Sequence, residues 1–270
     1  MMRAVLISGL ALALAVAAPA RADTERLFEA MQLDRLIGQM RDEGIAYGDT
    51  LAQEMLPGGP DRLWQQLIAR IYDADKMEQA VRTGFTKGFG DADPAPLVAF
   101  FESPEGAALV NAELDTREAF LEPDVEDAAR DIWRAADPTT RRQKLIAEYV
   151  EVNDLLDYNV TGAMNANYQF FVGLDEGGAV EMSQDDILRD VWAQEAETRE
   201  DTREWLFGFL TMAYDDLPEA TISEYVELSR SDAGKALNRA LFAGFDGMYA
   251  EQSLSLGLAV ASRMAAGEEL

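Results

Sequence analysis

The chain has 270 residues, 50 acidic and 23 basic side chains, a net charge of −27, and neither cysteine nor histidine. The lack of both residues excludes disulfide bonds, the usual zinc, copper and haem sites, and any catalysis by a thiolate or an imidazole. The negative surface also argues against nucleic acid as a partner, because phosphates would be repelled. The length suits one large domain or two small ones.

Residues 1–22 have the pattern of a secretory signal peptide. Arg3 precedes an uncharged run over 4–20, and Ala20-Arg21-Ala22 forms a small-x-small cleavage site. Cleavage is expected after Ala22, so the mature protein is expected in the periplasm or outside the cell. No later segment has the roughly 20 apolar residues that cross a bilayer, so no membrane span is expected after cleavage.

Helical periodicity dominates residues 23–136, the predicted first half of the mature chain. We expect a helix over 24–45, a break at the Pro-Gly-Gly-Pro of 57–60, and a short helix over 63–71. The next helix is predicted to begin at Asp75, which forms a capping box with Glu78. A helix that starts at Pro104 should end before Pro123, and another should cover 124–136.

Residues 137–270 form the predicted second half. Asp137-Pro138 is the expected cap and first helical residue of a long helix, which a turn at 175–178 follows. Ser183 is expected to cap the next helix, with a bend near Thr198 and a break at Pro218. No segment alternates at strand period, so the predicted fold is all-α, an antiparallel helical bundle built from two related helical halves.

Two short strings carry the clearest repetition in the chain. FFESPEGAALVNAE at 100–113 contains Ser103, Pro104 and Gly106, and LSRSDAGKALNRAL at 228–241 contains Ser231 and Gly234. Each serine is a predicted helix N-cap, and Pro104 fits the first helical position. Glycine is a poor helix former, so its place in both first turns indicates that another backbone packs there. These five residues form the predicted structural motif.

The repetition predicts an internal duplication. Five apolar residues upstream recur at one constant spacing: Leu27, Met31, Leu33, Leu36 and Ile37 match Ile146, Val150, Val152, Leu155 and Leu156. This spacing is about nine residues shorter than that of the two Ser-Gly strings. An insertion is therefore expected in the second half, at 173–182. The alternative is two well-capped helix starts in an ordinary helical protein.

The first string also carries a family resemblance. Its aromatic pair before Ser-Pro-Glu-Gly, at 100–106, resembles the bacterial exported family known as domain of unknown function 2059. The second string lacks the aromatic pair and the proline. The resemblance implies an all-helical envelope protein without an established activity, and it supplies no catalytic residue.

The sequence contains no motif that carries known chemistry. Asp73-Ala74-Asp75 and Asp91-Ala92-Asp93 lack the rest of a calcium-binding loop and are interpreted as caps and turns. Fifty acidic residues provide many accidental carboxylate pairs, with no reason to select one as a glycosidase pair. We therefore predict no cofactor, no metal site and no enzyme activity.

Two classes of function stay open. The first is a protein-binding or envelope-associated module that engages an unknown envelope protein. The second is a carrier that holds a small apolar ligand in a groove between the two halves, where apolar pockets tend to form. A carboxylate-dependent hydrolase is a third and more distant alternative.

Overall fold

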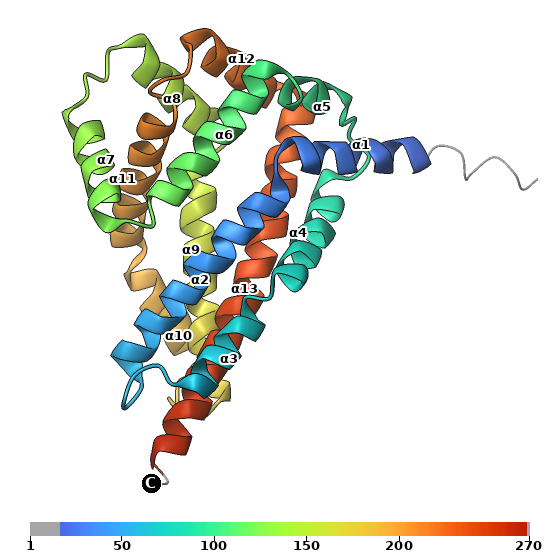
Figure 1. Cartoon of the computed structure of the whole chain (residues 1–270). Coiled ribbons are helices and arrows are strands. Elements are labelled where there is room, and N and C mark those ends of the chain that lie inside the picture. The colour runs from blue at the N-terminus through green and yellow to red at the C-terminus, as the bar shows by residue number, and fades with distance from the viewer. Residues whose placement is uncertain (1–16, 269–270) are drawn as a thin grey trace, which may run out of the picture.

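The structure is a computed structural model that describes residues 17–268, with side chains described over 23–266. Within this range the chain forms thirteen helices and no strand (Figure 1), so the predicted all-α class is confirmed. Residues 1–16 of the predicted signal peptide lie outside the described residues. Cleavage after Ala22 stays a prediction.

The helices follow one another through short connections. Those of the first half are α1 (Ala17–Ala30), α2 (Leu33–Met55), α3 (Arg62–Ile71), α4 (Ala74–Phe89), α5 (Ala95–Phe101), α6 (Pro104–Ala119) and α7 (Pro123–Ala135). Those of the second half are α8 (Arg141–Val152), α9 (Leu155–Glu176), α10 (Gln184–Ala193), α11 (Glu195–Ala213), α12 (Glu219–Arg230) and α13 (Asp232–Glu268). The 37-residue α13 runs through the molecule between α9 and α4 (Figure 1).

The helix predicted over 24–45 is broken at Gln32, which has a left-handed backbone with φ of 52°. The Gln32 side-chain amide donates a hydrogen bond of 2.9 Å to Asn111 Oδ1 on α6. The break lets α1 turn onto α5, while α2 continues along α3, α4 and α6. Tertiary packing therefore overrides a periodicity that would have continued as one helix.

Two predicted helix starts are also corrected. Helix α4 is capped by Asp73, whose carboxylate accepts a hydrogen bond from Lys76 N, so Asp75 lies inside the first turn. Helix α8 is capped by Thr140, three residues after Asp137. Asp137 instead accepts a hydrogen bond from Thr139 N in the preceding turn. In both places a nearby oxygen competes for the free N–H groups of the first turn.

The two halves share one helix plan. Gln32 and Asp154 are the two non-glycine residues with positive φ in the described chain, at 52° and 50°, and each precedes the second helix of its half. Asp61 and Ser183 each cap the third helix, by accepting the N–H three residues later. Residues 32 and 154, and residues 61 and 183, are both about 122 positions apart, as a duplicated unit predicts.

The spacing between these kinks and caps shows that the predicted alignment of the two halves and the predicted position of the insertion need correction. Leu27 aligns with Tyr149, three residues beyond the predicted Ile146, because the left-handed kinks fix the alignment. The insertion predicted at 173–182 is wrong, because the same spacing still holds at Ser183. The extra residues lie in α11, with 19 residues against 16 in α4, and in α12, with 12 against 7 in α5.

Buried apolar side chains form two clusters that bind the halves together. The larger includes Trp64 and Phe85, and the smaller includes Ile146 and Ile222. Helix α4 of the first half packs on α13 of the second, and α11 of the second packs on α6 of the first. The halves therefore interlock, and the spaces at their boundary are formed by helices from both.

Candidate functional site

The two Ser-Gly motifs have the same local geometry. Ser103 Oγ accepts a hydrogen bond from Gly106 N at 3.0 Å and donates one to Phe100 O at 2.6 Å. Ser231 Oγ has the same two bonds, from Gly234 N at 3.0 Å and to Leu228 O at 2.6 Å. Pro104 is the first residue of α6, as expected. Each serine thus caps one helix and also holds the end of the helix before it.

The two glycines make these corners possible. A Cβ atom on Gly106 would lie 2.1 Å from Phe100 O, and one on Gly234 would lie 2.1 Å from Leu228 O. The backbone that packs against each glycine therefore belongs to the end of the preceding helix. Because each serine hydroxyl is already bonded twice within its own corner, the motif is a structural element and not a ligand site.

The two corners meet through a cluster of aromatic side chains that surrounds Glu113. Phe100 stacks on Tyr225 with ring centroids 5.5 Å apart, and the Tyr149 hydroxyl donates to the Tyr225 hydroxyl at 3.0 Å. Burial raises the pKa of Glu113 to about 7, although a hydrogen bond from Tyr214 opposes this rise. The hollow beside Tyr149 and Tyr225 has a volume of about 30 Å³, which suits water rather than a substrate.

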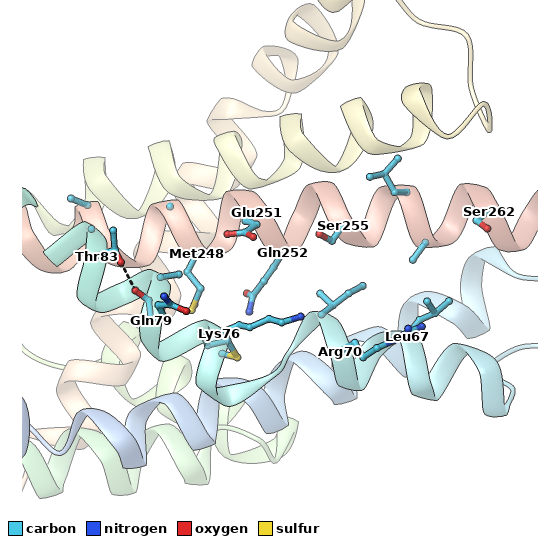
Figure 2. Close-up of a pocket in the computed structure, with 18 residues that line it drawn as sticks. Leu67, Arg70, Lys76, Gln79, Thr83, Met248, Glu251, Gln252, Ser255 and Ser262 are labelled. Atoms are coloured by element: carbon cyan, nitrogen blue, oxygen red, sulfur yellow. Dashed lines mark hydrogen bonds between the residues drawn. The ribbon is translucent and has the colours of Figure 1, made fainter. Parts of the chain in front are cut away.

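A much larger groove lies between the two halves. Helices α3 and α4 form one wall and α13 forms the other, around a volume of about 870 Å³ (Figure 2). Volumes of roughly 300–1,000 Å³ are typical of binding pockets. The buried side chains of Met77 and Met248 lie at its base, so the floor of this α3–α4/α13 groove is apolar.

Two basic side chains give the groove a positive wall. Lys76 on α4 and Arg70 on α3 are exposed, and neither forms an ion pair within the described residues. By contrast, Arg82 on α4 pairs with both Glu78 and Glu25. Glu251 on α13 is the one acidic side chain among the described residues that line the groove. In a chain with a net charge of −27, this groove is therefore a suitable place for an anionic group.

Gln252 is a buried polar residue at the base of the groove. Its side chain is 6% exposed, and neither Oε1 nor Nε2 has a hydrogen-bond partner among the described residues. Figure 2 shows it directed from α13 toward the α3–α4 wall. Gln252 also lines a smaller hollow of about 330 Å³, whose walls include Tyr72 and Phe170. An unpaired buried amide costs about 1–3 kcal/mol, so a bound group that paired with it would gain free energy.

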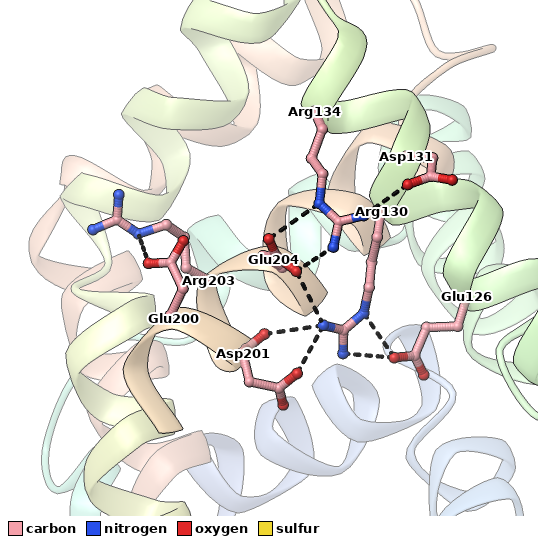
Figure 3. A network of polar contacts seen from close by, with 8 residues as sticks. All are labelled: Glu126, Arg130, Asp131, Arg134, Glu200, Asp201, Arg203 and Glu204. Atoms are coloured by element: carbon pink, nitrogen blue, oxygen red, sulfur yellow. Dashed lines mark hydrogen bonds and ion pairs between the residues drawn. The ribbon is translucent and has the colours of Figure 1, made fainter. Parts of the chain in front are cut away.

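Helix α7 covers the outer face of α11 through a network of ion pairs (Figure 3). Arg130, whose side chain is 12% exposed, pairs with Glu126 at 2.6 Å and with Asp201 at 2.8 Å. Glu204 accepts hydrogen bonds from Arg134 and lies 3.7 Å from Arg130.

Apolar contacts also hold α7 on α11. We call the surface of α11 that α7 covers, which includes Asp201, Glu204 and Gly208, the seat of α7. Trp133 stacks on Phe207 with centroids 5.3 Å apart, and Ala129 is buried. Gly208 of α11 leaves room for the α7 backbone, because a Cβ there would lie 3.1 Å from Arg130 N. Helix α7 is therefore held by one apolar stripe and by arginines that face carboxylates.

The sequence did not identify the residues of the groove. Of the five predicted motif residues, none lines it, and Gly234 lines only the small hollow beside Tyr225. Gln252 was detectable in principle, because it interrupts an apolar helical stripe that contains Met248 and Leu256. Lys76 carried no such signal, because only the fold decides which carboxylates lie near it.

Within residues 17–268 no three acidic side chains gather in a way that could hold a metal ion. Over the same residues no helix combines the length and the apolar character needed to cross a membrane. Comparisons with models of known families, with characterised proteins and with solved structures find no match. The family resemblance of 100–106 stays a prediction, and function is inferred from the chain's own residues.

Proposed function

We propose that this chain is an exported, non-enzymatic binding module, and that the α3–α4/α13 groove is its docking surface for a partner protein. One observation carries the proposal: an apolar groove at the boundary of the halves combines unpaired cations with a buried amide that has no partner among the described residues. Lys76 and Arg70 supply positive charge without an ion-pair partner among the described residues, and Gln252 supplies a buried amide without a hydrogen-bond partner among them. Such groups orient a partner on an apolar surface.

The length of the groove supports a protein partner. Its lining follows α13 from Ala243 to Ser262, which is about 28 Å at the rise of an α-helix. A small molecule would occupy only part of this length. A segment of secondary structure from another protein would fill it.

Site-specific photo-crosslinking tests the docking surface in the native cell. Thr83 lines the groove, whereas Thr86 lies one turn further along α4 and does not. The two residues are matched, because each is exposed and donates its hydroxyl to the carbonyl four residues earlier. We expect a photoreactive residue at Thr83 to give a discrete protein adduct that Thr86 does not give. Adducts from Thr86 alone, or from neither position, would contradict the proposed surface.

The second candidate is a carrier of a small apolar ligand in the 330 Å³ hollow, favoured by the aromatic side chains beside the unpaired amide of Gln252. Native mass spectrometry of protein purified from its own envelope tests it. A co-purified small molecule that is lost in the Gln252→Leu variant would support the carrier. Protein without such a molecule, in both forms, would count against it.

A further inference from the structure

The shared helix plan gives the α3–α4/α13 groove a counterpart in the other half. Helix α4 buries the stripe of Val81, Phe85 and Phe89, and α11 with its C-cap residue buries the stripe of Leu206, Leu210 and Tyr214. Each member of the second stripe lies about 125 positions after its equivalent in the first. The α4 stripe faces α13, and the α11 stripe lies in one cluster with Leu109 of α6, so the buried faces of the two helices have equivalent neighbours.

The same spacing relates the groove to the seat of α7. Three groove-lining residues of α4 correspond to three residues of α11: Lys76, Gln79 and Thr83 to Asp201, Glu204 and Gly208. Helix α7 lies over these α11 positions, through the pairs of Arg130 with Asp201 and Glu204 and through its contact with Gly208. The three α4 residues are exposed, and no described segment lies over them.

We propose that the α3–α4/α13 groove binds an amphipathic α-helix of the partner protein, which lies along α4 as α7 lies along α11. This inference rests on the proposed function and specifies its partner. Helix-in-groove binding requires an apolar stripe on the ligand, and the apolar floor of the groove matches it. Helix α7 has 13 residues, or about 20 Å, which is shorter than the roughly 28 Å of α13 that lines the groove.

The charges of the two surfaces predict the charge of the partner helix. Asp201 and Glu204 of α11 form ion pairs with Arg130 and Arg134 of α7. At the equivalent face of the first half, Lys76 stands where α11 has Asp201 and the neutral Gln79 stands where it has Glu204, while Arg70 on α3 adds a second positive charge to the same groove. The partner helix is therefore expected to carry acidic side chains where α7 carries its arginines. Complementary charges of this kind determine orientation and partner choice.

One difference between the two surfaces limits the approach of the helix. Thr83 stands where α11 has Gly208, so the partner backbone must lie further from α4 than α7 lies from α11. Ala80 and Gly84 lie beside Thr83 and are small, so the rest of this face of α4 does not project into the groove. A small residue in the partner, equivalent to the buried Ala129 of α7, suits this contact.

A charge-swap titration tests the proposal. The probe is a fluorescein-labelled peptide of residues 122–136 that carries Arg130→Glu and Arg134→Glu, and the control is the unchanged peptide. Fluorescence anisotropy with the full chain should show saturable binding of the acidic probe and at least tenfold weaker binding of the control. In the double variant Arg70→Glu, Lys76→Glu this preference should reverse.

A control variant on the same helix tests whether the position of the charge matters. Lys87 is an exposed lysine on α4 that does not line the groove, so Lys87→Glu should leave the affinity of the probe unchanged. Equal binding of both peptides, or an equal loss with Lys87→Glu, would overturn the inference. Dimerisation of the chain that the double variant abolishes would assign the groove to a second copy and would also overturn it.

Failure of this inference is distinguishable from failure of the proposed function. If neither peptide binds while Thr83 still gives a protein adduct in cells, the groove docks a partner that is not an acidic helix, and only the inference falls. If the Thr83 adduct is also missing, both the helix-binding inference and the proposed function are contradicted.

Discussion

The Tyr214 hydroxyl donates a hydrogen bond of 2.6 Å to Glu113 Oε1, which joins the end of α11 to α6 inside a cluster of buried tyrosines. Burial raises the pKa of Glu113 to about 7, and burial together with the Glu113 charge raises the pKa of Tyr149. No ion pair joins Glu113 to another described residue. A carboxyl group in this position makes the stability of the fold depend on pH near neutrality.

The first prediction concerns this dependence. Because the pKa of Glu113 is higher in the folded chain than in the unfolded chain, the folded chain binds the proton more tightly. The contribution to stability is fully present below the unfolded pKa of about 4.3 and is lost as the pH rises through 7. Glu113→Gln should therefore raise the free energy of unfolding at pH 8 by at most about 3 kcal/mol. Denaturant titrations at pH 5 and pH 8 measure this.

The control for Glu113 is Glu151→Gln, an exposed glutamate on α8 without an ion pair among the described residues. It should leave the difference between pH 5 and pH 8 unchanged. If Glu113→Gln and Glu151→Gln give the same pH dependence as the parent chain, Glu113 does not control this transition.

The second prediction concerns the two serine caps. Ser103→Ala and Ser231→Ala should each lower the free energy of unfolding by about 1 kcal/mol, because Gly106 N and Gly234 N lose their acceptors. Ser262→Ala, at an exposed position of α13, serves as the control. Thermal unfolding compares the three variants, and equal melting temperatures for all would refute the capping role.

The third prediction concerns Gly→Ala substitutions. The same change should lower the free energy of unfolding at two glycines and raise it at a third. Gly106→Ala and Gly234→Ala should each destabilise by about 1–3 kcal/mol, because the new Cβ meets a backbone carbonyl at 2.1 Å. Gly38 lies inside α2, where an added Cβ would have no neighbouring atom within 4 Å, so Gly38→Ala should stabilise by up to about 1 kcal/mol. Stabilisation at all three sites in urea titrations would show that the two corners are not closely packed.

The fourth prediction concerns the seat of α7. Arg130→Met leaves Glu126 and Asp201 without their shared partner and should destabilise by about 1–3 kcal/mol. Arg203 is the matched control, because its one ion-pair partner among the described residues, Glu200, lies 3.9 Å away at the surface (Figure 3). Arg203→Met should cost less than about 1 kcal/mol. Hydrogen exchange over 123–135 should quicken with Arg130→Met alone, and equal exchange in both variants would contradict the assignment.

The fifth prediction concerns export. If the signal peptide is removed after Ala22, N-terminal sequencing of protein from the native host should begin at Asp23. In that form Arg26 keeps its ion pairs with Asp23 and Glu102, so the remaining part of α1 stays attached to the end of α5. A full-length cytoplasmic form as the main product would rule out export by this route.

The sequence alone was sufficient for the fold class and for several helix starts. Apolar periodicity and caps are local signals, because they depend on residues three or four apart. Ser103, Ser231 and Ser183 could therefore be identified as caps without tertiary information, and the structure has all three. The repeated Ser-Gly string likewise encodes a corner whose contacts lie within six residues.

Only the tertiary structure decided the register of the halves, the break at Gln32 and the position of the groove. A helical apolar stripe looks the same after a shift of three residues, so Leu27 could be matched to Ile146 although the fold aligns it with Tyr149. The charge of the groove is equally non-local. With 50 acidic side chains in the chain, only folding determines that Arg130 acquires carboxylate partners and that Lys76 has none among the described residues. The unpaired state of Gln252 has the same origin, because its surroundings come from helices far apart in sequence.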